Sequence, residues 1–457
     1  MVVGGVVALV YSLLARRDRQ QVAGWIALAT TIAAALLTLA MVGSEPTLTF
    51  FDTYARDSAA ATARLIVLAA TAITIVFSLP WFARDPRHGE YYTLLLYSAL
   101  GAVLLAGATD LKEFVVAMLL SSATGFVLAA YHRQSSPAAE AAIKYYLIGA
   151  LANSAMLMGV AILFGLAGGT TLGALTSGLP VPGGPATIGG VALLLVGVTF
   201  KLGAVPLHPW VPDVAQGAPA PVAAFITAVP KVGAMVFLAR FVLALPPGSV
   251  SWEVLVAILA TATMSLGNLA CLWQDDVRRL LGWSAVSQTG YGLMAIVALG
   301  RSDLAVAALL FFLVAYVPGN LAAFGVVVAL RGRTALRDYG GVGRGRPALT
   351  GALALSFLSF IGVPPLSGFM AKLLLFLVTI QAGFAWLAVV AAVNTVVSIF
   401  YYVRVLAAAY FWDQAGRWPV LGRAAGWATL GSASALVVTG VLSEPLIAWF
   451  RSVNILR

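Results

Sequence analysis

Charged residues are scarce in this sequence, and their scarcity excludes a soluble globular protein. Only 10% of the 457 residues are Asp, Glu, Lys or Arg, whereas 61% are hydrophobic and the mean hydropathy is +0.97. No soluble fold of this length could bury so many apolar side chains. The composition therefore indicates an all-α integral membrane protein that crosses the bilayer many times.

Cysteine and histidine are almost absent. The single cysteine, Cys271, excludes a disulfide within the chain and a cysteine-bound iron–sulfur cluster. The three histidines, His88, His132 and His208, are too scattered for a metal site. No glycine-rich nucleotide fingerprint opens a strand–helix unit. We therefore expect this chain to hold no cofactor and no metal, and to perform no redox chemistry itself.

About fourteen apolar segments, separated by short loops, make up the chain instead. None of the loops is long enough for a soluble domain. The segments lie near residues 2–15, 22–42, 59–80, 91–109, 111–131, 142–166, 187–207 with a continuation at 219–226, 227–246, 252–273, 280–299, 303–330, 348–381, 383–411 and 424–449. Each is long enough to be a membrane-spanning helix or a large part of one.

The net charge of +10 reflects membrane orientation and not nucleic-acid binding. Arginines gather in the loops after odd-numbered segments, for example Arg16, Arg87, Arg133 and Arg417, and are few in the opposite loops. Positively charged loops stay on the cytoplasmic side. We therefore expect a multi-pass protein of the cell (inner) membrane with both termini on the non-cytoplasmic side, lipid around it and no nucleic-acid partner.

Lysine is rare even among the basic residues. Five of the 27 basic residues are lysine, and all lie in or at the edge of apolar segments: Lys112, Lys144, Lys201, Lys231 and Lys372. A lysine inside hydrocarbon costs ~2.5–3.5 kcal/mol on insertion scales and therefore tends to have a polar pathway or partner. Lysine, unlike arginine, can release its proton when desolvated. The last three lysines are thus candidates for proton transfer, whereas the first two could snorkel or form static pairs.

Two apolar segments are interrupted by proline. Lys201 and Lys231 flank a stretch with five prolines and His208, and a second break, at Pro364-Pro365, precedes Lys372. Unwound backbone at membrane depth is tolerated only inside protein or beside water. Paired breaks in the two halves of a chain are typical of repeated transporter folds. The expected units are residues 1–90, a first inverted repeat at 91–246, a second at 247–411, and a last helix within 412–457. The alternative is that the prolines serve helix packing alone.

Four strings carry a resemblance to a known family. They are EAAIKYYLIGAL at 140–151, FKLGAVPLHPWVPDVAQGAPAPVAAF at 200–225, DDVRRLLGWSAVSQTGYGLMAI at 275–296 and GVPPLSGFMAK at 362–372. Together they resemble subunit N of respiratory complex I, the proton-translocating NADH:quinone oxidoreductase. That subunit is antiporter-like and is related to subunits of Mrp-type cation/proton antiporters. Lysine at 372 resembles subunit N more than its sister subunit M, which usually has glutamate there.

The resemblance implies a proton path. Lys201 and Lys231 match the lysines of the first half-channel and the central axis, Lys372 matches the lysine near the exit, and His208 matches a histidine beside the break. It also implies other membrane subunits of a complex I-type assembly as partners, and places NADH, FMN, iron–sulfur clusters and quinone in partner subunits. Two cations on a poorly solvated path repel each other, so protonating one tends to expel the proton of the next.

The sequence departs from the family pattern at several positions. Leu119 stands where the family has a glutamate that pairs with the lysine matched by Lys201, and Glu113 is a possible substitute. Gln288 replaces a usual histidine; it can hold water but cannot titrate. Pro230 should kink the helix or start it at Lys231. Three functions stay open: a working proton-translocating subunit, a subunit of a multi-subunit Na⁺/H⁺ antiporter, or a non-pumping structural paralogue.

The remaining charged residues receive simpler interpretations. Glu140 and Lys144 have the spacing of a local ion pair, with a role in the proton axis as the alternative. Asp213 should bind backbone donors near the break. Arg404, inside a span, needs a carboxylate, a carbonyl or a lipid head group, and a lipid or neighbouring subunit is the favoured partner. Further expectations are that Arg64 and Arg240 snorkel and that Asp275, Asp276, Arg278 and Arg279 form a solvated turn.

Overall fold

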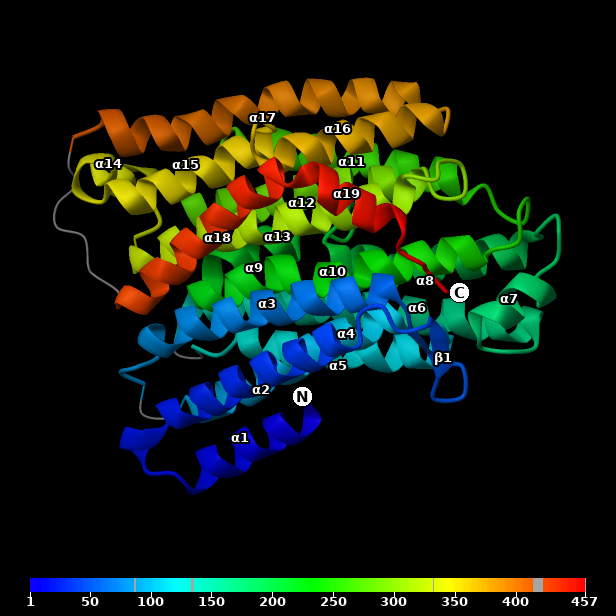
Figure 1. Ribbon diagram of the computed structural model, residues 1–457, viewed down its shortest axis with the longest axis horizontal. Helices are drawn as coiled ribbons and strands as arrows, with labels where there is room; N and C mark the ends of the chain where they lie inside the picture. Colours follow the sequence, from blue (N-terminus) through cyan, green and yellow to red (C-terminus); the bar gives the residue numbers. More distant parts are fainter. Residues whose placement is uncertain (86–87, 133–134, 332, 414–421, 457) are drawn as a thin grey trace.

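The computed structural model describes residues 1–85, 88–132, 135–331, 333–413 and 422–456, and this part of the chain is almost entirely helical (Figure 1). Arg87, Arg133 and Arg417 lie outside the described residues. A short antiparallel hairpin, β1 (Thr47–Thr49) and β2 (Tyr54–Arg56), follows the second helix. The helices are α1 (Val2–Leu14), η1 (Arg17–Arg19), α2 (Gln21–Ala40), α3 (Ser58–Trp81), α4 (Gly89–Gly107), α5 (Leu111–Ala129), α6 (Ser136–Ala167), α7 (Leu172–Gly178), α8 (Pro185–Leu202), α9 (Trp210–Gly217), α10 (Ala220–Ala244), α11 (Trp252–Cys271), α12 (Val277–Val297), α13 (Ala305–Ala329), η2 (Leu336–Tyr339), α14 (Val342–Gly345), α15 (Pro347–Ile361), α16 (Ser367–Gln381), α17 (Ala385–Phe411), α18 (Arg423–Val441) and α19 (Ser443–Arg451).

The long helices lie side by side as one elongated bundle, with α1 at one edge and α17 at the other (Figure 1). Within the described residues, eleven helices are long and apolar enough to cross a membrane, and α1, α15 and α16 are shorter apolar helices. If α15 with α16 counts as one interrupted span, as α8 with α9 does, and α12 is included, the elements correspond to the fourteen predicted segments.

Both predicted helix breaks are present, and each begins at a glycine with positive φ. Helix α8 ends at Gly203 (φ +66°), and α15 ends at Gly362 (φ +94°). A left-handed glycine is a common end of a helix because it has no Cβ to clash. The chain resumes as the short helix α9 after the first break and as α16 after the second.

The predicted boundaries around the first break were wrong. The continuation of the broken helix is α9, at Trp210–Gly217, whereas residues 219–226 belong to α10. Helix α10 begins at Ala220, with Pro221 in its first turn, where a missing N–H is harmless. It then runs through Pro230 without starting anew at Lys231. Its membrane-depth part is completely buried, so tertiary packing overrides the proline.

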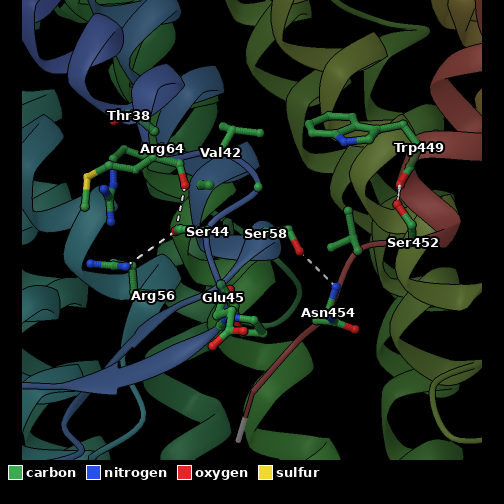
Figure 2. A pocket seen from close by; sticks show the side chains of 16 residues that line it. Thr38, Val42, Ser44, Glu45, Arg56, Ser58, Arg64, Trp449, Ser452 and Asn454 are labelled. Carbon is green, nitrogen blue, oxygen red and sulfur yellow. Dashed lines mark hydrogen bonds between the residues drawn. The ribbon is translucent and has the colours of Figure 1, made fainter.

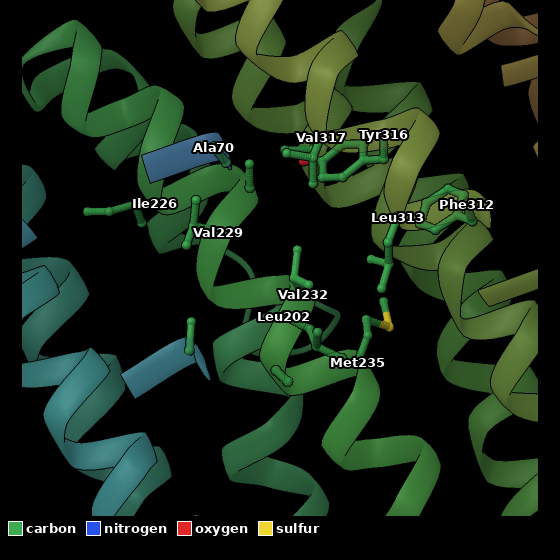
Figure 3. Close-up of a cluster of buried hydrophobic side chains, with 14 of the residues drawn as sticks. Ala70, Leu202, Ile226, Val229, Val232, Met235, Phe312, Leu313, Tyr316 and Val317 are labelled. Carbon is green, nitrogen blue, oxygen red and sulfur yellow. The ribbon is translucent and has the colours of Figure 1, made fainter. Parts of the chain in front are cut away.

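Equivalent helix pairs recur in the two halves of the chain. In the first half α4 packs on α5 and α10, and α6 packs on α8; in the second half α11 packs on α12 and α17, and α13 packs on α15. Helix α10 also packs on α3 and α13, where a cluster of buried apolar side chains joins the halves (Figure 3). This arrangement is the repeated, antiporter-like fold expected from the sequence.

Two arginines expected at the membrane or solvent surface are instead buried. The Arg240 side chain is fully buried in α10 and forms a two-point ion pair with Asp57, at 2.6 and 2.7 Å. It also donates to the carbonyl of Ala106 at 2.9 Å and to that of Leu456. Arg278 is 8% exposed and donates to the carbonyls of Ala215 and Ala218. Each is buried and donates to oxygen atoms inside the protein, so the snorkelling and solvated-turn interpretations were wrong for these two residues.

Candidate functional site

Lys201 is buried in the last turn of α8, two residues before the first break. Its Nζ lies 2.7 Å from Ser122 Oγ and 3.4 Å from Ser121 Oγ, both on α5, and the residue is only 1% exposed. Among the described residues, no carboxylate forms an ion pair with it. Its positive charge is therefore met by neutral hydroxyl groups.

Lys231 lies near the middle of α10 and is also buried. Its Nζ donates to the carbonyl of Ala285 at 2.6 Å and to Thr289 Oγ1 at 2.9 Å, both on α12. The ring of Tyr316 lies 5.7 Å away, within reach of a cation–π interaction. The surroundings of Lys231 are again polar but uncharged.

Thr289 connects the sites of these two lysines. Its hydroxyl lies 2.9 Å from the carbonyl of Leu202, the residue that follows Lys201, and 3.0 Å from that of Ala285. One hydroxyl thus accepts from Lys231 and can donate to the end of α8. This places the first helix break and the lysine of α10 in one hydrogen-bonded chain.

Lys372 lies on α16, the helix that follows the second break, whereas Lys201 precedes the first break. The Nζ of Lys372 lies 3.2 Å from the carbonyl of Ile361, at the end of α15, and 3.1 Å from Thr395 Oγ1 on α17. It lies 4.3 Å from the centre of the Tyr291 ring, and the hydroxyl of Tyr291 contacts Thr395 at 3.1 Å. The lysine is 6% exposed.

A small cavity lies between the surroundings of Lys231 and those of Lys372. It has a volume of about 10 Å³, and its lining includes Gln288, Tyr316, Ser359 and Lys372. That volume is about what one water molecule needs. The side chain that replaces the expected histidine therefore faces a space that one water can fill.

Near the first break, three buried polar atoms have no hydrogen-bond partner among the residues that the structure describes. They are Nδ1 of His208 and the indole Nε1 atoms of Trp210 and Trp283. The His208 and Trp283 rings pack against each other, with centroids 5.4 Å apart. Buried polar nitrogen atoms, whether donors or acceptors, are rarely left unsatisfied, so ordered water is the expected partner.

The acidic residues near the break bind cations rather than backbone. Lys144 forms ion pairs with Glu140, at 2.6 Å, and with Asp213, at 2.9 Å. Asp213 also binds Arg279, at 2.6 Å. The backbone-binding interpretation of Asp213 was therefore wrong, because two cations from α6 and α12 converge on it. The local Glu140–Lys144 pair has the predicted spacing.

Glu113 and Leu119 are not partners of Lys201. Glu113 lies at the start of α5 and interacts with Thr53 and Asp110, more than two turns before Ser122. Leu119 is 41% exposed, on the outer face of α5. The proposed substitution of Glu113 for the missing glutamate was therefore wrong.

Arg404 finds its partners inside the chain. Its guanidinium donates to Leu272 O at 2.9 Å, to Gln274 O, and to Asp275 Oδ1 at 2.8 Å. These carbonyls belong to the C-terminal end of α11, where backbone acceptors lack helical partners. The favoured lipid or neighbouring-subunit contact is thus replaced by an intramolecular cap.

Sequence reasoning missed the neutral residues that hold the lysines. Ser121, Ser122, Thr289 and Thr395 each contact a buried Nζ. A polar network beyond Thr395 links Asn394 to Asn268 at 3.0 Å. Small hydroxyl residues are common in membrane helices, so only their placement opposite lysine could have identified them.

Comparisons with known proteins identify relatives of this chain in sequence and in fold. Residues 108–398 match the family model described as NADH:quinone oxidoreductase/Mrp antiporter, TM. A relative from Mycobacterium sp. (strain JLS), NADH-quinone oxidoreductase subunit N, is 42% identical over 88% of this chain and 85% of its own. A chain of respiratory complex I from Thermus thermophilus with bound aureothin is 31% identical, with a TM-score of 0.85 over 98% of this chain and 97% of that one. A chain of the Mrp complex from Dietzia sp. DQ12-45-1b shares the fold, with a TM-score of 0.87 at 18% identity over 98% and 95% of the two chains.

Proposed function

Because this chain belongs to the NADH:quinone oxidoreductase/Mrp antiporter transmembrane family, we propose that it is a proton-translocating membrane subunit of an NADH:quinone oxidoreductase. It works in the cell membrane together with other membrane subunits. NADH, FMN, iron–sulfur clusters and quinone are bound by partner subunits, and electron transfer takes place there. This chain contributes the proton path.

One observation carries the proposal: three buried lysines are held by neutral oxygen atoms. Lys201 contacts serine hydroxyls, Lys231 a carbonyl and a threonine, and Lys372 a carbonyl and a threonine. A permanent carboxylate partner would fix the charge of an ammonium group, whereas these acceptors also tolerate the neutral amine. The protonation of each lysine therefore responds to charge on the next.

The path runs from the first break to the second. A proton arrives beside His208, Trp210 and Trp283, whose unpartnered nitrogen atoms hold water, and reaches Lys201. The Thr289 hydroxyl accepts from Lys231 and donates to the carbonyl of Leu202, so it holds the end of α8 against Lys231, and the charge on Lys201 acts on Lys231 through space. Water in the cavity beside Gln288 and Tyr316 then connects the surroundings of Lys231 to Lys372. When Lys231 is protonated, repulsion between like charges favours release from Lys372.

We propose that the chain contains two inverted repeats, each with one of the two helix breaks. The first inverted repeat is residues 91–246 and the second is 247–411, with helices before and after them. Five spans per repeat bring the two breaks into opposite orientations, which suits an entrance half-channel on one side and an exit on the other. Both termini then lie on the non-cytoplasmic side.

Although Leu119 stands where the family has a glutamate, we favour a working proton path over a non-pumping scaffold. A scaffold that had lost pumping would gain stability by replacing its buried lysines with apolar residues, because an unpaired buried charge is costly. All three lysines and their hydroxyl partners are present. A Na⁺/H⁺ antiporter subunit remains the alternative, and the shared fold with the Mrp chain is compatible with it.

The decisive experiment measures proton pumping and NADH oxidation together in the purified complex reconstituted into vesicles. Lys201→Ala should lower the number of protons pumped per NADH while leaving the subunits assembled. Lys112→Ala is the matched control, because that lysine is 71% exposed at the start of α5. Unchanged pumping in Lys201→Ala would contradict the proposed path. Sodium/proton exchange by a complex lacking flavin and iron–sulfur subunits would favour the antiporter.

A further inference from the structure

A pocket of about 360 Å³ lies apart from the lysine path, at the end of the bundle where α2 stops and α3 begins (Figure 2). Residues after α2, the β1–β2 hairpin, the first turns of α3 and the tail after α19 line it. Figure 2 shows Arg56 and Arg64 on one side of the pocket and Trp449, Ser452 and Asn454 on the other. The lining thus combines cationic, hydroxyl and aromatic groups.

The two arginines in this pocket lack anionic partners. Arg56 reaches only Ser44 Oγ, at the long distance of 3.5 Å, and Arg64 donates to the hydroxyl of Tyr54 at 2.7 Å. Among the described residues, neither arginine forms an ion pair. The Nε atom of each is buried without an acceptor. A buried guanidinium N–H needs an acceptor, and the described part of the chain does not supply one here.

The carboxylates near the pocket do not neutralise these arginines. Asp57 is occupied by the two-point pair with Arg240. Glu45 is exposed and, within the described residues, makes no ion pair. Two guanidinium groups against one free carboxylate leave one excess positive charge in the pocket. A single anionic group would balance it.

The surroundings are those of a lipid head group. Helices α2 and α3 are long enough to cross the membrane, so the pocket lies where their spans end. The outer face of α2 leading to it is apolar, with Leu36, Leu37 and Leu39 more than half exposed. Trp449 lies at the pocket rim, and tryptophan favours the membrane interface.

We propose that this pocket binds the phosphate group of an anionic phospholipid. Arg56 and Arg64 would donate to the phosphate oxygens, since the guanidinium fork matches phosphate geometry. Hydroxyl groups such as that of Ser44 would contact the polar head group, and an acyl chain would lie along the outer face of α2. A phosphodiester carries one negative charge, which equals the excess charge of the pocket.

The test uses the purified complex, stripped of loosely bound lipid and then incubated with phosphatidylglycerol. Lipid that stays bound is quantified by mass spectrometry. Arg56→Gln combined with Arg64→Gln should lower retention of phosphatidylglycerol about ten-fold or more, because two charge-assisted contacts are lost. Arg451→Gln is the control, since that exposed arginine lies at the end of α19 but outside the pocket lining. Equal retention in the double variant and the parent would overturn the proposal.

A second variant tests the proposal without changing either arginine, so that a failure of the double variant to assemble does not decide the result. Glu45→Gln removes only the exposed negative charge, so it should raise retention of phosphatidylglycerol, and unchanged or lower retention would overturn the proposal. Inorganic phosphate distinguishes the two sources of a phosphate group. Displacement of the lipid by phosphate at the same concentration would identify a soluble-anion site and contradict the lipid. If phosphate fails to displace the lipid, the result supports a phospholipid site.

Discussion

Lys372 donates to the main-chain carbonyl of Ile361, 3.2 Å away, and Ile361 is the last residue of α15 before the second helix break. The break therefore supplies an acceptor that an intact helix would keep for itself. Lys372 also lies against the glycine that ends the helix, because a Cβ added at Gly362 would come within 3.2 Å of Lys372 Cδ. The unwound backbone and the lysine form one unit.

This contact predicts a specific effect of Gly362→Ala. The position has φ +94°, which costs an alanine ~1–2 kcal/mol, and the new methyl group would also force the Lys372 side chain, which contacts Ile361, to shift by a few tenths of an ångström. Gly383→Ala is the matched control, because Gly383 has φ +88° with open space around it. We expect similar losses of thermal stability in the two variants but loss of proton pumping only in Gly362→Ala. Equal pumping in the two variants would show that the contact between Lys372 and Ile361 is not needed for proton pumping.

The serine pair opposite Lys201 allows a second comparison within one helix. Ser122 Oγ lies 2.7 Å from Nζ and Ser121 Oγ lies 3.4 Å from it. Ser122→Ala should therefore slow pumping about ten-fold, as expected when an ammonium group loses a hydrogen bond worth ~1.5 kcal/mol. Ser121→Ala should have a much smaller effect. The measurement is the initial rate of acidification in vesicles, and equal rates for the two variants would show that Lys201 does not depend on Ser122.

The cavity beside Gln288 predicts a role for the amide group of that residue. Gln288→Leu keeps most of the side-chain volume but removes the amide group that lines the cavity beside Tyr316, Ser359 and Lys372. We expect lower pumping with normal assembly, and Gln288→His should retain pumping because imidazole also binds water. Gln381→Leu, at the exposed end of α16, is the control. Normal pumping in Gln288→Leu would exclude this cavity from the proton path.

The sequence predicts the fold and the buried lysines well because both rest on strong local signals. Apolar length predicted the spans, and proline predicted both breaks. The partners of the charged groups were harder to predict from the sequence. Contacts such as Ser122 with Lys201 or Leu272 with Arg404 join segments that are far apart in the chain. A surface position was the simplest expectation for Arg240. Its true environment depends on Asp57, 183 positions away, and no local pattern encodes that pair.

The Arg240–Asp57 pair predicts a large effect on stability. Both side chains are completely buried, and Asp57 also accepts from the main-chain N–H of Leu456, which ties the C-terminal tail to α3. Asp57→Ala would leave Arg240 buried without its carboxylate, so thermal unfolding or loss of the subunit from the complex should reveal a cost of about 3–5 kcal/mol. Replacing both residues, as in Asp57→Leu with Arg240→Met, should recover much of that loss, because two apolar side chains need no partner. If the single variant were as stable as the parent, water would have to reach Arg240, and the pair would not be the anchor of the tail. Asp18→Ala, at an exposed ion pair with Arg16 on the surface, should change stability little in the same assay.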